Sequence, residues 1–95
     1  MGLGKLLRVE RTINIYTASQ SETLGEIQHE INIDILDLET LKKIVTPNID
    51  DPLVYDGYPL TWEQIESLNV FIDQKINPDF TLFEYYLECY GIYET

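Results

Sequence analysis

Apolar and polar residues alternate along two segments in the first third of the chain. Every second position is apolar in residues 7–15, except Arg11, and again in residues 27–33, except His29. A period of two is typical of a strand that buries one face and exposes the other. The polar residues 17–23 predict a connecting loop, so the two strands predict a hairpin.

The two exceptions raise the question of how the strands pair. If Ile13 pairs with Ile27, Arg11 lies opposite His29, and a buried arginine then requires a carboxylate from a later element. The alternative is that Arg11 lies near the margin of the sheet with its guanidinium in water. The loop contains no tight-turn dipeptide that would fix the register.

A helical spacing of apolar residues replaces the alternation after residue 36. Asp37 is expected to be the N-cap of a first helix, which the Thr46-Pro47 pair ends. The apolar stripe of this helix consists of Leu38, Leu41, Ile44 and Val45.

A second helix is predicted after residue 60. Thr61 and Gln64 have the spacing of a capping box, which begins a helix by satisfying its first N–H groups. The buried stripe of this helix is expected to consist of Trp62, Ile65, Leu68 and Ile72. Residues 47–59 form a connection between the helices that is long for so small a domain.

The final segment, FTLFEYYLECYGIYET, fits two structures. As a helix it would begin with a capping box at Thr81 and Glu84. As a strand it would alternate, with Phe83, Tyr85, Leu87 and Cys89 inside and Glu84, Tyr86, Glu88 and Tyr90 outside. We favour the strand, because a third strand makes the sheet wide enough for two helices to cover.

These elements predict one α+β domain over residues 1–95. A small antiparallel sheet, formed by the N-terminal hairpin and the C-terminal strand, would be covered on one face by two helices. The order of elements would be β-β-α-α-β, with a helical C-terminal segment as the alternative.

Charge narrows the choice of partner. The chain has 17 acidic and 6 basic residues, a formal net charge of -11, and after residue 43 the only basic residue is Lys75. This imbalance disfavours direct contact with nucleic acid or an anionic membrane and favours a basic protein partner. No apolar run approaches the length of a membrane span, and the single cysteine, Cys89, favours a reducing compartment, so we expect a cytoplasmic protein.

The residue types that carry catalysis or metal binding form no recognisable set. His29 is the only histidine, and the acidic neighbours of Cys89 disfavour a reactive thiolate. A calcium loop centred on Gly57 would place Pro52 and Val54 at positions that need side-chain ligands. We therefore predict no catalytic, cofactor or metal site, and expect that the protein is not an enzyme.

Tyrosines and carboxylates occur together in the long connection and near the C-terminus. Tyrosine supplies a large contact area at low entropic cost and carboxylates steer a basic partner, so these segments are candidate contact surfaces. The candidate partner-binding residues are Asp50, Asp51, Tyr55, Asp56, Tyr58, Glu63, Glu66, Glu84, Tyr86, Glu88 and Tyr90.

The loop DDPLVYDGYPLT and the closing YYLECY resemble segments of a group of small acidic bacterial proteins. That group is similar to the immunity proteins that neutralise toxins of polymorphic and contact-dependent systems, and the resemblance covers roughly residues 7–92. It implies a non-enzymatic inhibitor and carries no catalytic residue across.

The leading hypothesis is therefore an immunity or antitoxin protein that masks a basic surface of a partner, such as a nuclease toxin. One alternative is a nucleic-acid mimic of the phage type, which would need carboxylates in rows at phosphate-like intervals. Another is a structural homo-oligomer subunit that uses a free strand edge or the tyrosines. We expect a monomer or a weak homodimer.

Overall fold

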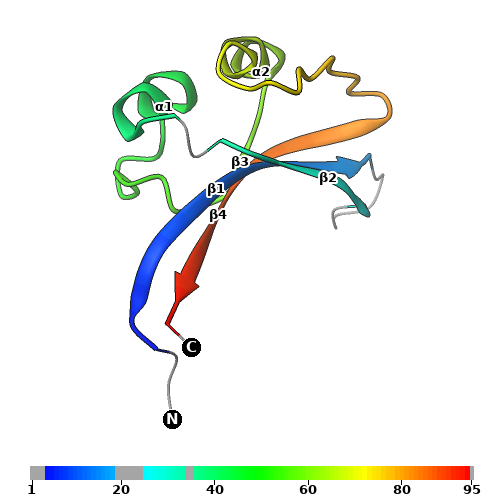
Figure 1. The fold of residues 1–95 in the computed structure, drawn as a ribbon. Helices are drawn as coiled ribbons and strands as arrows, with labels where there is room; N and C mark the ends of the chain where they lie inside the picture. The colour runs from blue at the N-terminus through cyan, green and yellow to red at the C-terminus, as the bar shows by residue number, and fades with distance from the viewer. Residues whose placement is uncertain (1–3, 19–24, 34–35, 95) are drawn as a thin grey trace.

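The computed structural model describes residues 4–18, 25–33 and 36–94 and contains one antiparallel sheet and two helices (Figure 1). The elements are β1 (Leu6–Thr17), β2 (Ile27–Asn32), α1 (Leu38–Val45), β3 (Tyr58–Pro59), α2 (Trp62–Asn69) and β4 (Phe83–Tyr93). The α+β class and the order β-β-α-α-β are confirmed. The structure adds β3, a two-residue strand within the long connection between the helices.

The C-terminal segment is a strand in the centre of the sheet, so the helical alternative is wrong. The strand order is β2-β1-β4-β3, and β4 pairs antiparallel with β1 along most of its length. Aromatic and β-branched residues suit a strand that is paired on both sides. Tyr85 and Leu87 of β4 are buried, as the alternation predicts.

The pairing of Ile13 with Ile27 is wrong by four residues. Ile13 pairs with Ile31, and His29 pairs with Ile15 instead of Arg11. The register shifts between Ile15 and Tyr16, which indicates a bulge in β2. Residues 19–23 of the predicted hairpin loop lie outside the described residues.

The first helix begins and ends as predicted. The Asp37 carboxylate accepts a hydrogen bond from the Thr40 N–H at 2.7 Å, which satisfies one of the free N–H groups of the first turn. Leu41 and Val45 are buried. Thr46 ends the helix in the left-handed conformation, with φ 54°.

The second helix begins with the predicted capping box. The Thr61 side chain accepts from the Gln64 N–H at 3.2 Å, and the Gln64 side chain accepts from the Thr61 N–H at 2.9 Å. Ile65 and Leu68 are fully buried, but Trp62 is 53% exposed. The prediction that Trp62 belongs to the buried stripe is therefore wrong.

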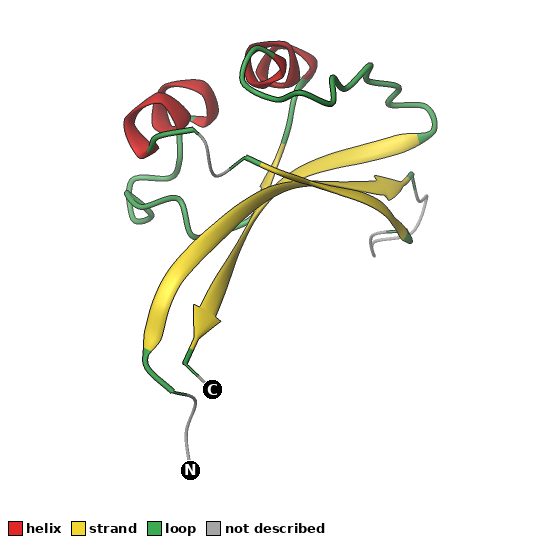
Figure 2. Cartoon of the chain, viewed as in Figure 1, coloured by secondary structure: helices red, strands yellow, loops and turns green. Residues whose placement is uncertain are grey.

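Both helices lie on the same side of the sheet, and the core lies between the two layers (Figure 2). Ile13, Ile31 and Leu87 of the sheet meet apolar side chains of both helices there. The opposite face of the sheet has no described helix over it (Figure 2). We call this second face the open face.

Strands β1 and β4 continue past the helices and bend away from them (Figure 1). This two-stranded arm ends at Lys5 and Glu94. The Glu94 N–H donates to the Lys5 carbonyl at 2.8 Å, which closes the pairing at the tip of the arm.

Candidate functional site

The open face brings together the tyrosines and carboxylates of the C-terminal strand. Residues 84, 86, 88 and 90 of β4 alternate with the core residues and therefore point to the face without helices. The partners of β4 on β1 include Thr12, which pairs with Glu88, and Asn14, which pairs with Tyr86. The candidate contact residues on this face are Glu84, Tyr86, Glu88 and Tyr90.

Hydrogen bonds join the side chains of the open face into a network. Asn14 is fully buried although no described helix covers it. Its amide oxygen accepts from the Thr12 hydroxyl at 2.6 Å, and its amide nitrogen donates to the hydroxyls of Tyr90 at 2.7 Å and Tyr16 at 3.2 Å. The Tyr90 hydroxyl in turn donates to the Glu30 carboxylate of β2 at 3.4 Å. A network with its members satisfied fixes the positions of these side chains.

Aromatic rings form the surface of this network. Tyr16 and Tyr86 make an edge-to-face contact, with ring centroids 5.9 Å apart and an interplanar angle of 82°. The sequence indicated that Thr12 and Asn14 point away from the core, but not that they are buried. Their burial follows from tyrosine packing, which the alternation of residues alone does not show.

Partial burial changes the acidity of two groups on the open face. Loss of solvent raises the pKa of the Glu88 carboxyl above its usual range. Burial also raises the pKa of Tyr90; the hydrogen bond from Asn14 opposes this rise and the nearby charge of Glu30 adds to it. A positive charge near Glu88 would stabilise the charged form of its carboxyl.

The long connection reaches the open face beside Glu88. A Cβ atom on Gly57 would lie 3.0 Å from the Glu88 carboxylate, so a larger residue there would crowd that side chain. Gly57 immediately precedes β3, which pairs with β4. The loop and the open face therefore adjoin at the edge of the sheet.

Asp51 and Tyr58 hold the long connection together. The Asp51 carboxylate accepts from the N–H groups of Tyr55 and Asp56 at 2.9 and 3.0 Å and from the Tyr58 hydroxyl at 2.5 Å. The bond from Tyr58 is the largest cause of the lowered pKa of Asp51. Because Asp51 is 7% exposed, its carboxylate belongs to the loop's own structure.

Arg11 fastens the same connection to β1. Its guanidinium donates to the carbonyls of Val54 at 3.3 Å and Leu53 at 2.5 Å, and lies 6.0 Å from the ring centre of Tyr55. Val54 has a φ of 56°, a left-handed conformation that is uncommon for a β-branched residue. Arg11 is half-buried, so it is not at a margin in open water, and its charge helps to lower the pKa of Asp51.

The remaining candidate contact residues lie on other surfaces. Asp50, Tyr55 and Asp56 are exposed in the long connection, and Glu63 and Glu66 are exposed on α2. Helix α2 lies on the opposite side of the sheet from the open face (Figure 2). The sequence-based set is therefore divided between the open face, the connection and the helix layer.

His29 and Cys89 do not meet in space. Their partners on β1, Ile15 and Arg11, are four residues apart, and β2 and β4 flank β1 on opposite sides. With strands about 4.8 Å apart and a rise of about 3.3 Å per residue, the two positions are separated by roughly 16 Å. Within residues 4–18, 25–33 and 36–94, no three His, Cys, Asp or Glu side chains form a group that could hold a metal ion.

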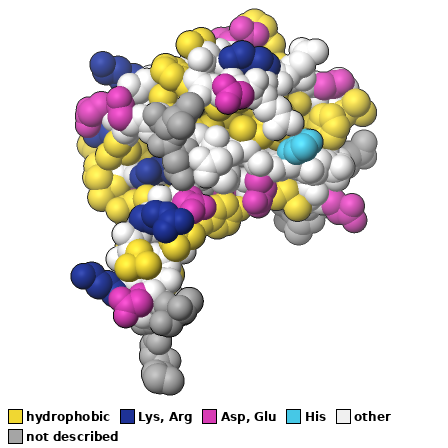
Figure 3. Space-filling model, viewed as in Figure 1, with side chains coloured by type: hydrophobic (Ala, Val, Ile, Leu, Met, Phe, Trp, Pro, Cys, Tyr) yellow, Lys and Arg dark blue, Asp and Glu magenta, His cyan; other side chains and the backbone are white. Residues whose placement is uncertain are grey.

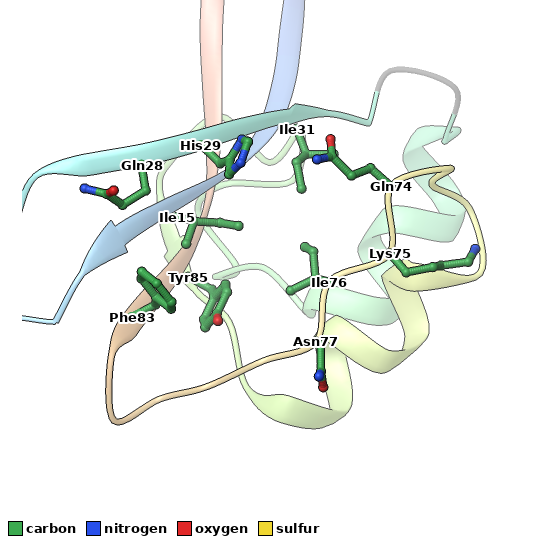
Figure 4. Close-up of a pocket in the computed structure, with 10 residues that line it drawn as sticks. All are labelled: Ile15, Gln28, His29, Ile31, Gln74, Lys75, Ile76, Asn77, Phe83 and Tyr85. Carbon is green, nitrogen blue, oxygen red and sulfur yellow. The ribbon is translucent and has the colours of Figure 1, made fainter.

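A cavity beneath β2 was not anticipated from the sequence. It has a volume of about 200 Å³ and lies between β2 and the segment that follows α2 (Figure 4). Ile15, Ile76, Phe83 and Tyr85 give it an apolar lining, and His29 lies beside it. We call it the β2 cavity.

The chain matches a protein family described as a domain of unknown function (DUF7683) over residues 10–88. The chain therefore belongs to this family, and the match includes both helices, β2, β3 and the parts of β1 and β4 nearest the helices. No curated protein and no solved structure matches the chain. Neither described helix combines the length and the apolar character needed to cross a membrane.

Proposed function

We propose that the protein is a non-enzymatic acidic binding protein of the immunity or antitoxin type, which masks a basic surface of a partner such as a nuclease toxin. The observation that carries this proposal is the open face, where Glu84 and Glu88 alternate with Tyr86 and Tyr90 on one central strand. Carboxylates next to ordered aromatic rings suit a contact with basic side chains.

The order of the open face supports a binding role. Tyr90 is bonded to Asn14 at 2.7 Å, and Tyr86 is in contact with Tyr16. Side chains that are already held in place lose little conformational entropy when a partner binds. The net charge of -11 would add electrostatic steering, which raises the association rate and makes it sensitive to salt.

The spacing of the carboxylates favours this function over nucleic-acid mimicry. Glu84 and Glu88 are four residues apart on a strand, a separation of roughly 13 Å. Phosphates follow one another every ~3.4 Å of axis along one DNA strand. The tyrosine between the two carboxylates suits a protein contact better than a row of phosphates. The single cysteine of the chain, Cys89, is consistent with a role in the cytoplasm.

The test combines partner capture with matched charge variants. The immobilised protein is exposed to a lysate of its source cell at low salt, and the captured protein is identified, purified and used in association-rate measurements. We expect a basic partner whose association rate falls at least tenfold between about 50 and 300 mM salt. Failure to recover such a partner would contradict the proposal.

Two double variants locate the contact. Glu84→Gln with Glu88→Gln removes two charges from the open face, whereas Glu63→Gln with Glu66→Gln removes two from α2. Because the total charge is the same in both, only the first should slow association several-fold beyond the effect of net charge. Equal effects would show that the overall charge, and not the open face, attracts the partner.

A further inference from the structure

Strand β2 has an edge that no described strand occupies. It stands at the end of the order β2-β1-β4-β3 and pairs only with β1. The Ile33 N–H donates to the Arg11 carbonyl at 3.0 Å, and Ile31 pairs with Ile13 in the same register. In an antiparallel pair the bonded positions alternate, so Glu30 turns its N–H and carbonyl away from β1.

The β2 cavity opens beside this edge. Figure 4 shows β2 along one side of the cavity, Gln74 to Asn77 along a second, and Phe83 and Tyr85 along a third. A second hollow, of about 270 Å³, follows residues 27–30 of the same strand. An added strand would therefore find space for side chains next to the hydrogen-bonding groups of β2.

The other face of β2 carries the carboxylate of Glu30. Glu30 is exposed and accepts a hydrogen bond from Tyr90 of the open face. In Figure 3 the visible end of the molecule around β2 shows acidic, apolar and histidine side chains and no lysine or arginine among the described residues. Lys75 lines the β2 cavity, but its ammonium donates to the carbonyls of Asn69 and Ile72 and points away from it (Figure 4).

We propose that β2 receives an extended segment of the partner protein as an additional strand, and that this segment alternates basic and apolar residues. The residue opposite Glu30 would be basic, because directly paired side chains point to the same face. Its two neighbours would place apolar side chains toward the β2 cavity, on the other face. The inference rests on the proposed function and specifies which part of the partner is recognised.

A strand added to β2 would be bound through both its main chain and its side chains. The outward N–H and carbonyl of Glu30 supply hydrogen bonds that any sequence can make, and the cavity and the carboxylate select the sequence. Edge strands are often protected by lysine, proline or a bulge. Strand β2 contains neither lysine nor proline, and its bulge lies between Ile27 and His29, so the register at Glu30 is regular.

A second copy of this chain is a poorer occupant of the same edge. Antiparallel pairing of β2 with β2 of a second copy would bring Glu26 and Glu30 of one copy near Glu26 and Glu30 of the other. Like charges across a strand pair are destabilising, and two chains of net charge -11 repel each other at a distance. A basic segment avoids both costs.

The experiment uses the full chain and a synthetic peptide. A capped seven-residue peptide of alternating lysine and isoleucine is titrated into ¹⁵N-labelled protein, next to a peptide of the same composition with its isoleucines grouped together. We expect saturable binding of the alternating peptide, with amide shift changes at Glu30 and Ile31. The grouped peptide should bind at least tenfold more weakly.

Three variants separate the contributions. Glu30→Pro removes the outward N–H and the charge without touching the bonds between β2 and β1, and should weaken binding at least tenfold. Glu30→Gln removes the charge alone and should weaken it a few-fold. Gln74→Trp, at an exposed position beside the cavity, should block apolar side chains and weaken binding at least fivefold. Glu39→Gln, at an exposed position on α1, is the matched control and should change binding less than twofold.

Each contrary result has a distinct meaning. Absence of binding, or equal binding of the two peptides, overturns strand addition but leaves the proposed function, which the capture experiment and the Glu84 and Glu88 variants test. Binding that survives both Glu30→Pro and Gln74→Trp also overturns it. If light scattering finds a dimer that Glu30→Pro converts to a monomer, the edge serves a second copy, and the inference is wrong.

Discussion

Ile13 and Asn14 are neighbours on β1, and both are completely buried, but they are buried by different means. Ile13 lies in the apolar core beneath the helices. Asn14 points to the open face, where the hydroxyls of Tyr16 and Tyr90 bond to its amide. The comparison teaches that the two faces of one sheet can be equally closed to water while depending on different forces. Apolar packing tolerates changes of pH, whereas a polar network requires each of its partners.

The largest expected effect is on the helix-covered face. Leu87→Ala should lower the free energy of unfolding by about 2–5 kcal/mol, because Leu87 is fully buried and its truncation leaves a cavity. Urea denaturation measures this loss. Tyr86→Ala, at the adjacent residue, whose side chain is on the open face, is the matched control. It should lower the free energy of unfolding clearly less. Equal losses would show that the open face contributes to the core as much as the helix-covered face does.

The next effect tests the polar network of the open face. Asn14→Ala should lower the free energy of unfolding by about 1–3 kcal/mol, because the buried Thr12 hydroxyl loses its partner and Tyr90 loses a donor. The same denaturation experiment measures it, with Thr12→Val as a smaller change in the same network. A neutral Asn14→Ala variant would mean that water replaces the network and that its order does not depend on Asn14.

The pH dependence of stability tests the role of Asp51 in the connection between the two helices. Its pKa is lowered in the folded state, so its stabilising contribution is present above the ordinary value near ~3.9 and is lost as the pH falls through the lower folded value. Asp51→Asn should therefore lower the Tm at pH 7, and the difference should shrink below about pH 4. Thermal denaturation from pH 3 to 7 measures this. Asp50→Asn, at an exposed neighbour, should leave the Tm nearly unchanged.

Substitution of Glu88 should change stability the least, and the change should be a gain instead of a loss. Burial raises the pKa of its carboxyl, so the folded state holds this proton more tightly, and stability falls as the pH rises above the ordinary value near ~4.3. Glu88→Gln should therefore stabilise the protein at pH 7, by roughly a few tenths of a kcal/mol after solvent screening. The gain should disappear near pH 3.5 in the same denaturation series. A loss of stability at pH 7 would mean that Glu88 has a stabilising partner in the folded protein.

The faces of the strands could be predicted from the sequence, but the register between β1 and β2 could not. The true pairing, Ile13 with Ile31, differs from the expected pairing with Ile27 by four residues. Because the side-chain period of a strand is two, any even shift keeps the same residues on the same face. Alternation therefore cannot distinguish these registers, and no tight turn does so in its place.

The sequence predicted only part of the candidate site, because alternation shows which face of a strand a side chain is on but not which tertiary contacts it makes. The alternation of Glu84, Tyr86, Glu88 and Tyr90 identified the outward side of β4, and the structure brings these residues together on one face. The role of Asp51 inside its own loop depends on contacts with Tyr55, Asp56 and Tyr58, which no periodic pattern encodes. The β2 cavity depends on how the segment after α2 crosses the sheet, a tertiary feature without a local signal.

The arm formed by β1 and β4 gives the protein a predictable response to mechanical force. Lys5 and Glu94 are bonded to each other at its tip, and the two strands run antiparallel from there into the core. Tension applied between these two residues would load the bonds of the arm one pair at a time, like a zipper, beginning with the bond from Glu94 to Lys5. Held by its two ends, the domain would open from the arm at low force, and the helix-covered core would be the last part to yield.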